Sequence, residues 1–170
     1  MKYVTLMRHA EARRADGIVE DIARPLTKEG RKAALAMGRF LAKRRLRPDV
    51  ILTSPSLRTM ETAARVQRSL GPGVRVICAP RLYDAASFVM IEEIARAPAN
   101  CAHALIVGHN PGLHRAANEL ADAVRSAAVP LNGVKETFPT AAIAHFEFGG
   151  DSWQAVTAGA GALTIFKAPD

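Results

Sequence analysis

Short apolar runs alternate along this chain with longer segments of helical periodicity. Residues 3–7, 51–53 and 104–107 are three such runs, and residues that favour strands dominate them. The segment from Thr27, its expected N-cap, to about Arg45 repeats its apolar residues at the spacing of a helix. Strands that alternate with helices usually pair in parallel. The sequence therefore predicts an α/β fold, a three-layer sandwich with a mostly parallel central sheet and helices on both faces.

The same patterns predict the remaining elements. The expected strands are residues 2–8, 50–53, 74–78, 103–107, 143–148 and 162–168, the last of them antiparallel at an edge of the sheet. Further helices are expected to open at Pro55, to span residues 87–97 and to follow Gly112, with Phe88 and Val124 on their inward faces.

Two segments lack either periodicity. Residues 10–26 are predicted to form a loop near the strand ends, and residues 130–139 a less ordered stretch. No linker or repeat interrupts the chain, so its 170 residues are expected to form a single domain, 1–170.

Basic and imidazole side chains follow three of the predicted strands. Arg8 and His9 end the first run, Arg58 comes shortly after the second, and His109 ends the third. The carboxyl ends of parallel strands meet at one edge of a sheet, where open α/β sheets bind ligands. We therefore expect these four side chains to converge on one crevice.

This combination of side chains suits phosphoryl chemistry. The guanidinium of arginine offers a planar fork of donors to phosphate oxygens, and an imidazole can act as a nucleophile near neutral pH. Two guanidiniums and two imidazoles would make a phosphoryl pocket that needs no metal. A simpler interpretation makes Arg8 and His9 an ordinary surface pair, but the recurrence at three strand ends favours the pocket.

Four motifs in this order resemble the histidine phosphatase superfamily, the phosphoglycerate-mutase-like enzymes, and most of all its small SixA-type phosphohistidine phosphatases. The motifs are LMRHAEA at residues 6–12, RPLTKEG at 24–30, SPSLRTMETA at 54–63 and VGHNPG at 107–112. The resemblance implies that His9 is the nucleophile and that Arg8, Arg58 and His109 hold the phosphoryl oxygens.

The resemblance also implies secondary roles. Arg24 matches a substrate-side arginine of this branch, and Asn110 is expected to support its turn or to touch the phosphate. A phosphate or sulfate ion is expected to fit the pocket, and neither a metal nor another cofactor is expected.

The chain departs from the family pattern at the proton donor. Mutase-like branches carry a glutamate after the third strand, whereas residues 81–85 read RLYDA here. Asp84 and Glu11 remain as candidates. A phosphohistidine carries its own protonatable leaving group, so the missing glutamate favours that substrate over sugar phosphates. Ala10 also stands where the superfamily has glycine, which we interpret as a marker of the branch.

The predicted function is a metal-independent phosphatase that removes phosphate from phosphohistidine on a protein phosphotransfer domain. Two alternatives stay open: a phosphomonoesterase for a small phosphorylated metabolite, and a non-catalytic module that binds phosphoprotein or nucleic acid.

Composition bears on partners and location. The formal net charge of +7 would attract anionic partners, but the aromatic residues that stack nucleobases are few, which disfavours nucleic acid. No apolar stretch is long enough for a membrane span or fits a signal peptide, so a cytoplasmic protein is expected. Cys78 and Cys101 follow no metal or disulfide pattern and are expected to be buried thiols.

Overall fold

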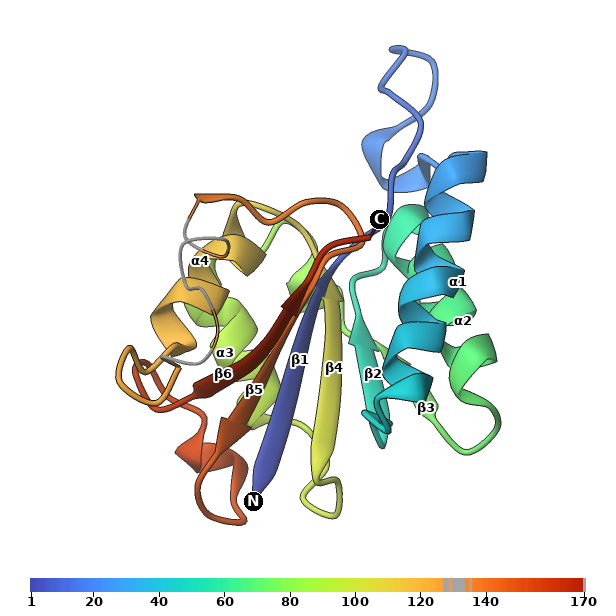
Figure 1. Ribbon diagram of the computed structural model, residues 1–170. Helices are drawn as coiled ribbons and strands as arrows, with labels where there is room; N and C mark the ends of the chain where they lie inside the picture. The colour runs from blue at the N-terminus through green and yellow to red at the C-terminus, as the bar shows by residue number, and fades with distance from the viewer. Residues whose placement is uncertain (127–128, 130–133, 135, 170) are drawn as a thin grey trace.

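A twisted six-stranded sheet forms the centre of the computed structural model, which describes residues 1–126, 129, 134 and 136–169 (Figure 1). The strand order is β3-β2-β4-β1-β5-β6. The strands are β1 Lys2–Arg8, β2 Val50–Thr53, β3 Arg75–Cys78, β4 His103–Gly108, β5 Ile143–Phe148 and β6 Ala162–Lys167.

The sheet is parallel over four strands and antiparallel at one edge. Strands β3, β2, β4 and β1 pair in parallel, and in the β1–β4 pair Arg8 lies opposite Gly108. Strands β5 and β6 add in antiparallel fashion beside β1. The predicted α/β class, the mostly parallel sheet and the antiparallel edge strand are therefore confirmed.

Helices cover both faces of the sheet (Figure 1). Helices α1 Lys28–Lys43 and α2 Leu57–Leu70 pack against each other on one face, and α3 Ser87–Ala95 and α4 Gly112–Leu120 lie on the other. Three short 3-10 turns complete the described elements: η1 Asp21–Ala23, η2 Pro80–Leu82 and η3 Trp153–Ala155. Thr27 caps α1 as predicted, since its side chain accepts a hydrogen bond from the Gly30 amide.

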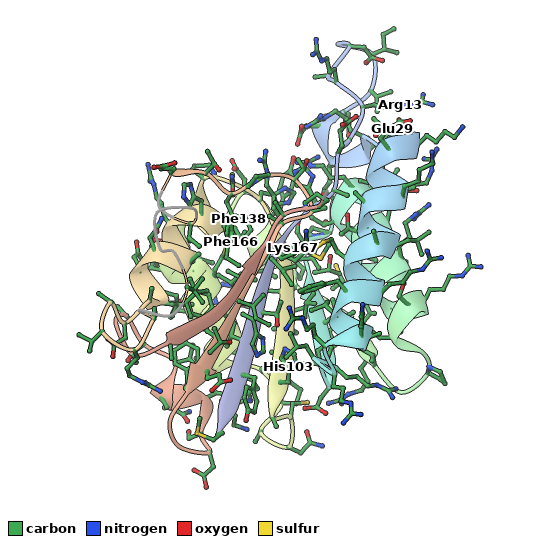
Figure 2. All side chains as sticks on the ribbon, viewed as in Figure 1. Arg13, Glu29, His103, Phe138, Phe166 and Lys167 are labelled. Atoms are coloured by element: carbon green, nitrogen blue, oxygen red, sulfur yellow. The ribbon has the colours of Figure 1, made fainter. Side chains whose placement is uncertain are left out.

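Two apolar layers hold the sandwich together because successive side chains of a strand point to opposite faces. In β1, Leu6 belongs to the cluster under α3 and α4, while Met7 belongs to the cluster under α1 and α2. On the first of these faces Phe138 packs edge-on against Phe166 of β6, with ring centroids 5.5 Å apart (Figure 2).

Residues 11–26, here called the arm, extend beyond the carboxyl edge of the sheet next to the start of α1 (Figure 1). Arg13 on the arm and Glu29 in the first turn of α1 are labelled in this part of the molecule (Figure 2). An isolated antiparallel bridge between Ala12 and Leu26 joins the two ends of the arm at its base. Apart from η1 it is irregular, as the sequence predicts.

Several sequence-based expectations are wrong in detail. Helix α2 begins at Leu57 with Ser56 at its N-cap, so Pro55 precedes the helix. Phe88 is 63% exposed, because it points away from the sheet at the first turn of α3. Val124 is 84% exposed, because α4 ends at Leu120.

Other expectations have mixed outcomes. Cys101 is buried as expected, whereas Cys78 is exposed on the edge strand β3. Half of the stretch 130–139 expected to be less ordered, residues 130–133 and 135, lies outside the described residues. None of the helices in the described part of the chain is long and apolar enough to cross a membrane.

Candidate active site

The centre of the sheet brings the two motif histidines together. His9 follows β1 and His109 follows the neighbouring strand β4, and the His9 amide donates to the Gly108 carbonyl oxygen at 3.1 Å. Their ring centroids lie 5.2 Å apart. The first turn of α2 adds Arg58, so the four side chains expected to converge line one pocket of about 460 Å³, together with Arg24 and Asn110.

His9 is held in one tautomer by its own neighbour. Its Nδ1 lies 2.7 Å from the carbonyl oxygen of Ala10, which can only accept a hydrogen bond, so Nδ1 carries the proton and Nε2 keeps its lone pair. Burial lowers the pKa of His9 to about 4. The hydrogen bond to the Ala10 carbonyl opposes this shift, whereas the charges of Arg58 and Arg8 add to it. At neutral pH the ring is therefore neutral and nucleophilic.

His109 is also neutral at physiological pH. Burial lowers its pKa to about 3, helped by His9 and Arg58. Its Nε2 lies 2.8 Å from the hydroxyl oxygen of Ser54, the residue that directly follows β2. The Tyr83 ring stands edge-on to the imidazole at 5.8 Å. Ser54 and Tyr83 are thus contacts of the site that the sequence reading did not single out.

One backbone carbonyl orients two further residues of the pocket. The Phe138 carbonyl oxygen accepts from Nη1 of Arg8 at 3.0 Å and from Nδ2 of Asn110 at 2.9 Å. Asn110 therefore ties its turn to the segment before β5, and its expected roles in supporting that turn or touching the phosphate stay predictions. Within the described residues, three buried polar atoms of this site lack a hydrogen-bond partner: Nε of Arg8, Nε of Arg58 and Oδ1 of Asn110.

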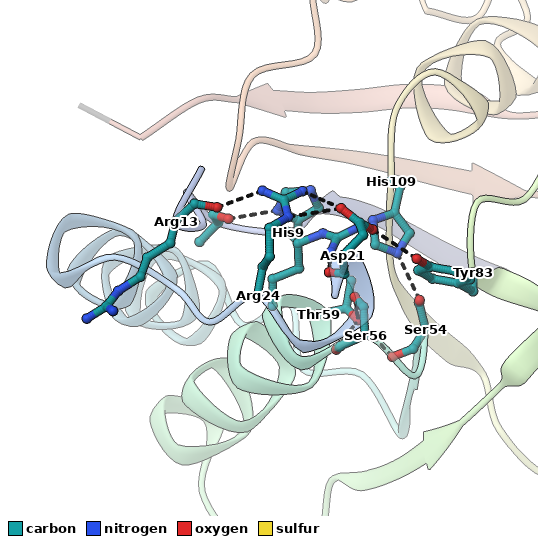
Figure 3. A network of polar contacts seen from close by, with 11 residues as sticks. His9, Arg13, Asp21, Arg24, Ser54, Ser56, Thr59, Tyr83 and His109 are labelled. Atoms are coloured by element: carbon teal, nitrogen blue, oxygen red, sulfur yellow. Dashed lines mark hydrogen bonds and ion pairs between the residues drawn. The ribbon is translucent and has the colours of Figure 1, made fainter. Parts of the chain in front are cut away.

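The arm delivers a carboxylate to the pocket that the sequence reading missed (Figure 3). Arg58, only 5% exposed, donates from Nη2 to Oδ2 of Asp21 at 3.0 Å and from Nη1 to the Asp21 backbone oxygen at 2.7 Å. Tyr83 donates its hydroxyl to the same Oδ2 at 2.9 Å, and Nη2 of Arg24 lies 2.8 Å from Oδ1. Asp21 sits in an irregular loop, so no periodicity or strand end in the sequence indicated it.

The two carboxylates expected as proton donors also line the pocket. Glu11 lies at the base of the arm, and Asp84 is an exposed residue with a left-handed backbone at φ +49°. Their roles remain predictions. Among the described residues there is no group of three or more His, Cys, Asp or Glu side chains that could hold a metal ion.

Comparison with known proteins agrees with this geometry. A sequence model of the histidine phosphatase superfamily (branch 1) matches residues 4–87, which include Arg8, His9 and Arg58. An uncharacterized protein of Mycobacterium tuberculosis, Rv1276c, is 35% identical over 163 residues, covering 96% of this chain and 99% of the relative. The chain belongs to the histidine phosphatase superfamily.

Solved structures of histidine phosphatases place the chain near the SixA branch. A protein from Nakamurella multipartitia, provisionally assigned as phosphohistidine phosphatase SixA, is 28% identical with a TM-score of 0.83, covering 99% of this chain and 96% of that one. Its counterpart from Agrobacterium tumefaciens, with the same provisional assignment, is 26% identical with a TM-score of 0.81, covering 99% and 98%. The protein is therefore a SixA-type phosphatase with a histidine nucleophile.

The wider histidine phosphatase fold includes enzymes for metabolites. A mycobacterial glucosyl-3-phosphoglycerate phosphatase, Rv2419c, matches all of both chains with a TM-score of 0.63 at 15% identity. That likeness concerns the fold alone.

Proposed function

We propose that the protein hydrolyses phosphohistidine on a protein phosphotransfer domain, with His9 as the nucleophile. The observation that carries the proposal is the bond between Nδ1 of His9 and the Ala10 carbonyl, because it leaves the Nε2 lone pair available in a pocket lined by Arg8 and Arg58. Arg8, Arg58 and His109 would hold the non-bridging phosphoryl oxygens. Fixed donors of this kind are the main requirement of phosphoryl transfer.

The reaction would proceed in two displacements. In the first, the Nε2 lone pair of His9 forms a bond to phosphorus, and the substrate's phosphorus–nitrogen bond breaks with its electron pair on the departing nitrogen. In the second, water bonds to phosphorus, Nε2 leaves with its electron pair, and both protons of the water stay with the phosphate product. Because Nδ1 remains protonated through its bond to Ala10, His9 leaves as a neutral imidazole.

Two features support a protein-bound phosphohistidine as the substrate. The structures that match at 28% and 26% identity are both provisionally assigned as phosphohistidine phosphatases. In addition, no glutamate stands after β3, where the mutase-like branches carry their proton donor. A phosphorylated imidazole can depart without such a donor.

A small phosphorylated metabolite is the second candidate substrate. A pocket of about 460 Å³ has room for a small ligand, and the fold is shared with a glucosyl-3-phosphoglycerate phosphatase. The third expectation, a non-catalytic binding module, loses its support because the family assignment makes the protein a phosphatase.

The test is to trap the covalent intermediate. With labelled phosphohistidine protein and an alkaline quench, label should appear on the wild-type enzyme. In His9→Gln, turnover should fall by at least about 10³-fold, by analogy with other removed nucleophiles. Full turnover in His9→Gln would exclude the mechanism. A panel of phosphohistidine protein, phosphoramidate and sugar phosphates would separate the two substrate classes.

A further inference from the structure

The Asp21 carboxylate lies beside the phosphoryl pocket but belongs to none of the motifs that identify the family. It reaches the pocket from η1 and is held by Arg58 and Tyr83 on Oδ2 and by Arg24 on Oδ1. Its side chain is 50% exposed, so a ligand entering the pocket can contact it. Figure 3 shows the carboxylate between His9 and Tyr83, close to His109.

This carboxylate is an acceptor and not an acid. Although partial burial raises the pKa of Asp21, hydrogen bonds from Tyr83, Arg24 and Arg58 outweigh that effect and lower it to about 2. At neutral pH the group is ionised and can accept hydrogen bonds but cannot supply a proton. An alkoxide leaving group would receive no help from it and would be repelled by its charge.

The anchors of Asp21 allow it to stay in place when substrate binds. When a phosphoryl oxygen accepts the hydrogen bond from Nη2 of Arg58, the Asp21 carboxylate loses only one of its three side-chain donors. Arg24 and Tyr83 approach from other directions and continue to hold the carboxylate. Asp21 would then border the phosphoryl group on the side of the arm.

A phosphorylated imidazole differs from a phosphate ester in the proton that its leaving group requires. When its distal ring nitrogen carries a proton, the ring leaves as neutral imidazole and no proton donor is required. An acceptor facing that nitrogen keeps the proton there. The enzyme provides this arrangement for its own imidazole, since the Ala10 carbonyl holds the proton on Nδ1 of His9.

We infer that Asp21 is a specificity-determining residue that accepts a hydrogen bond from the distal N–H of the substrate's phosphorylated imidazole, and so selects phosphorus–nitrogen over phosphorus–oxygen bonds. The phosphoryl group would pass between two imidazoles, each with an acceptor on its distal nitrogen. The substrate's phosphorus–nitrogen bond breaks, its electron pair stays on the leaving nitrogen, and the distal proton stays where Asp21 holds it. The inference rests on the proposed function and names the residue that enforces it.

The test compares two substrates across matched variants. N-phosphorylimidazole and p-nitrophenyl phosphate differ in the bond to phosphorus, and neither leaving group needs an added proton donor. In Asp21→Ala, the ratio of kcat/KM for the first substrate over the second should fall roughly 10- to 100-fold, the loss expected for a hydrogen bond to a charged group. The KM for p-nitrophenyl phosphate should also fall, because Arg58 no longer binds an internal carboxylate.

Two controls distinguish selectivity from damage to the arm. Asp16→Ala removes a carboxylate that caps a turn of the same arm through the Ile18 and Val19 amides, and it should leave the ratio at the wild-type value. Asp21→Glu restores an ionised acceptor and should recover part of the ratio. Equal losses on both substrates in Asp21→Ala would overturn the inference and make Asp21 a structural anchor of the arm.

Failure of the inference is distinguishable from failure of the proposed function. If labelled N-phosphorylimidazole leaves no alkali-stable label on wild-type His9, the proposed function fails. If the label forms and the substrate ratio is unchanged in Asp21→Ala, only the role of Asp21 is wrong.

Discussion

The hydroxyl of Ser54, a fully buried residue outside the pocket lining, contacts the His109 ring and can orient it. A neutral imidazole has one N–H and one lone pair, so it donates to a phosphoryl oxygen from one nitrogen only if the other accepts. The Ser54 hydroxyl lies 2.8 Å from Nε2, and when it donates to that nitrogen, Nδ1 carries the proton. In this way a residue that does not touch the phosphoryl group can fix the donor that does.

Replacing Ser54 should therefore weaken catalysis without disturbing the fold. We expect Ser54→Ala to lower kcat/KM roughly 2- to 12-fold, the range that corresponds to one neutral hydrogen bond. Ser56→Ala is the matched control, since the Ser56 hydroxyl bonds to Thr59 and not to His109. Steady-state kinetics on phosphohistidine protein measures both, and equal effects of the two substitutions would contradict the role of Ser54.

The site residues that could be predicted from sequence are those tied to regular elements. Arg8, His9 and His109 come at the ends of apolar strands, and Arg58 lies in the first turn of an amphipathic helix, so their convergence follows from strand pairing. Asp21 reaches the site only through the path of the arm. That path depends on tertiary contacts with α2 that leave no local pattern in the sequence.

At the scale of elements, the turn between β4 and α4 positions His109 against the segment that precedes α3. A Cβ built on Gly112 would lie 1.8 Å from the carbonyl oxygen of Ala85. Only glycine permits this approach of two backbones, and the approach keeps the His109 turn next to Tyr83.

Gly112→Ala should push these two segments apart. We expect a loss of about 1–3 kcal/mol in the free energy of unfolding, the usual cost of overpacking, together with reduced kcat because His109 is three residues away. Gly149→Ala is the control, since a Cβ there meets nothing within 4 Å. Urea unfolding followed by tryptophan fluorescence measures the difference, and equal stability of the two variants would refute the prediction.

Element type was easier to predict than the direction of individual side chains. The strand spans and the start of α1 follow from local patterns and capping, and they agree with the structure to within a residue or two. Phe88 shows where this reasoning stops, because helical spacing alone does not tell which stripe of a short, largely apolar helix faces the sheet.

At the scale of the whole molecule, buried neutral histidines link stability to pH. Away from the active site, His103 and His145 share the Thr5 hydroxyl at 2.8 Å each, across β4, β1 and β5. Burial lowers the pKa of both histidines to about 4. In the unfolded chain they titrate near the ordinary value of about 6.5. The unfolded state therefore binds more protons between pH 6.5 and 4, and stability falls as pH drops through that window.

A single substitution should make this dependence shallower. Between pH 7.5 and 5, each such histidine accounts for about 2 kcal/mol of lost stability. His145→Gln should therefore lose about 2 kcal/mol less than the wild type over this interval, even if it is less stable at pH 7.5. Urea unfolding at the two pH values measures both losses, and identical losses would show that His145 does not titrate in this way.

The backbone around His9 is tied on both sides. Its amide bonds to Gly108 of β4, and its carbonyl accepts from Ala141 just before β5. Together with the bond from Nδ1 to Ala10, these ties hold the His9 ring at the carboxyl end of β1, whatever group carries the phosphate. Adjustment to phosphorylated partners of different bulk would then fall to the arm, which is irregular apart from η1 and projects beyond the sheet. Evolution of new substrate preference in this scaffold would then proceed through changes in residues 11–26, with the strands left intact.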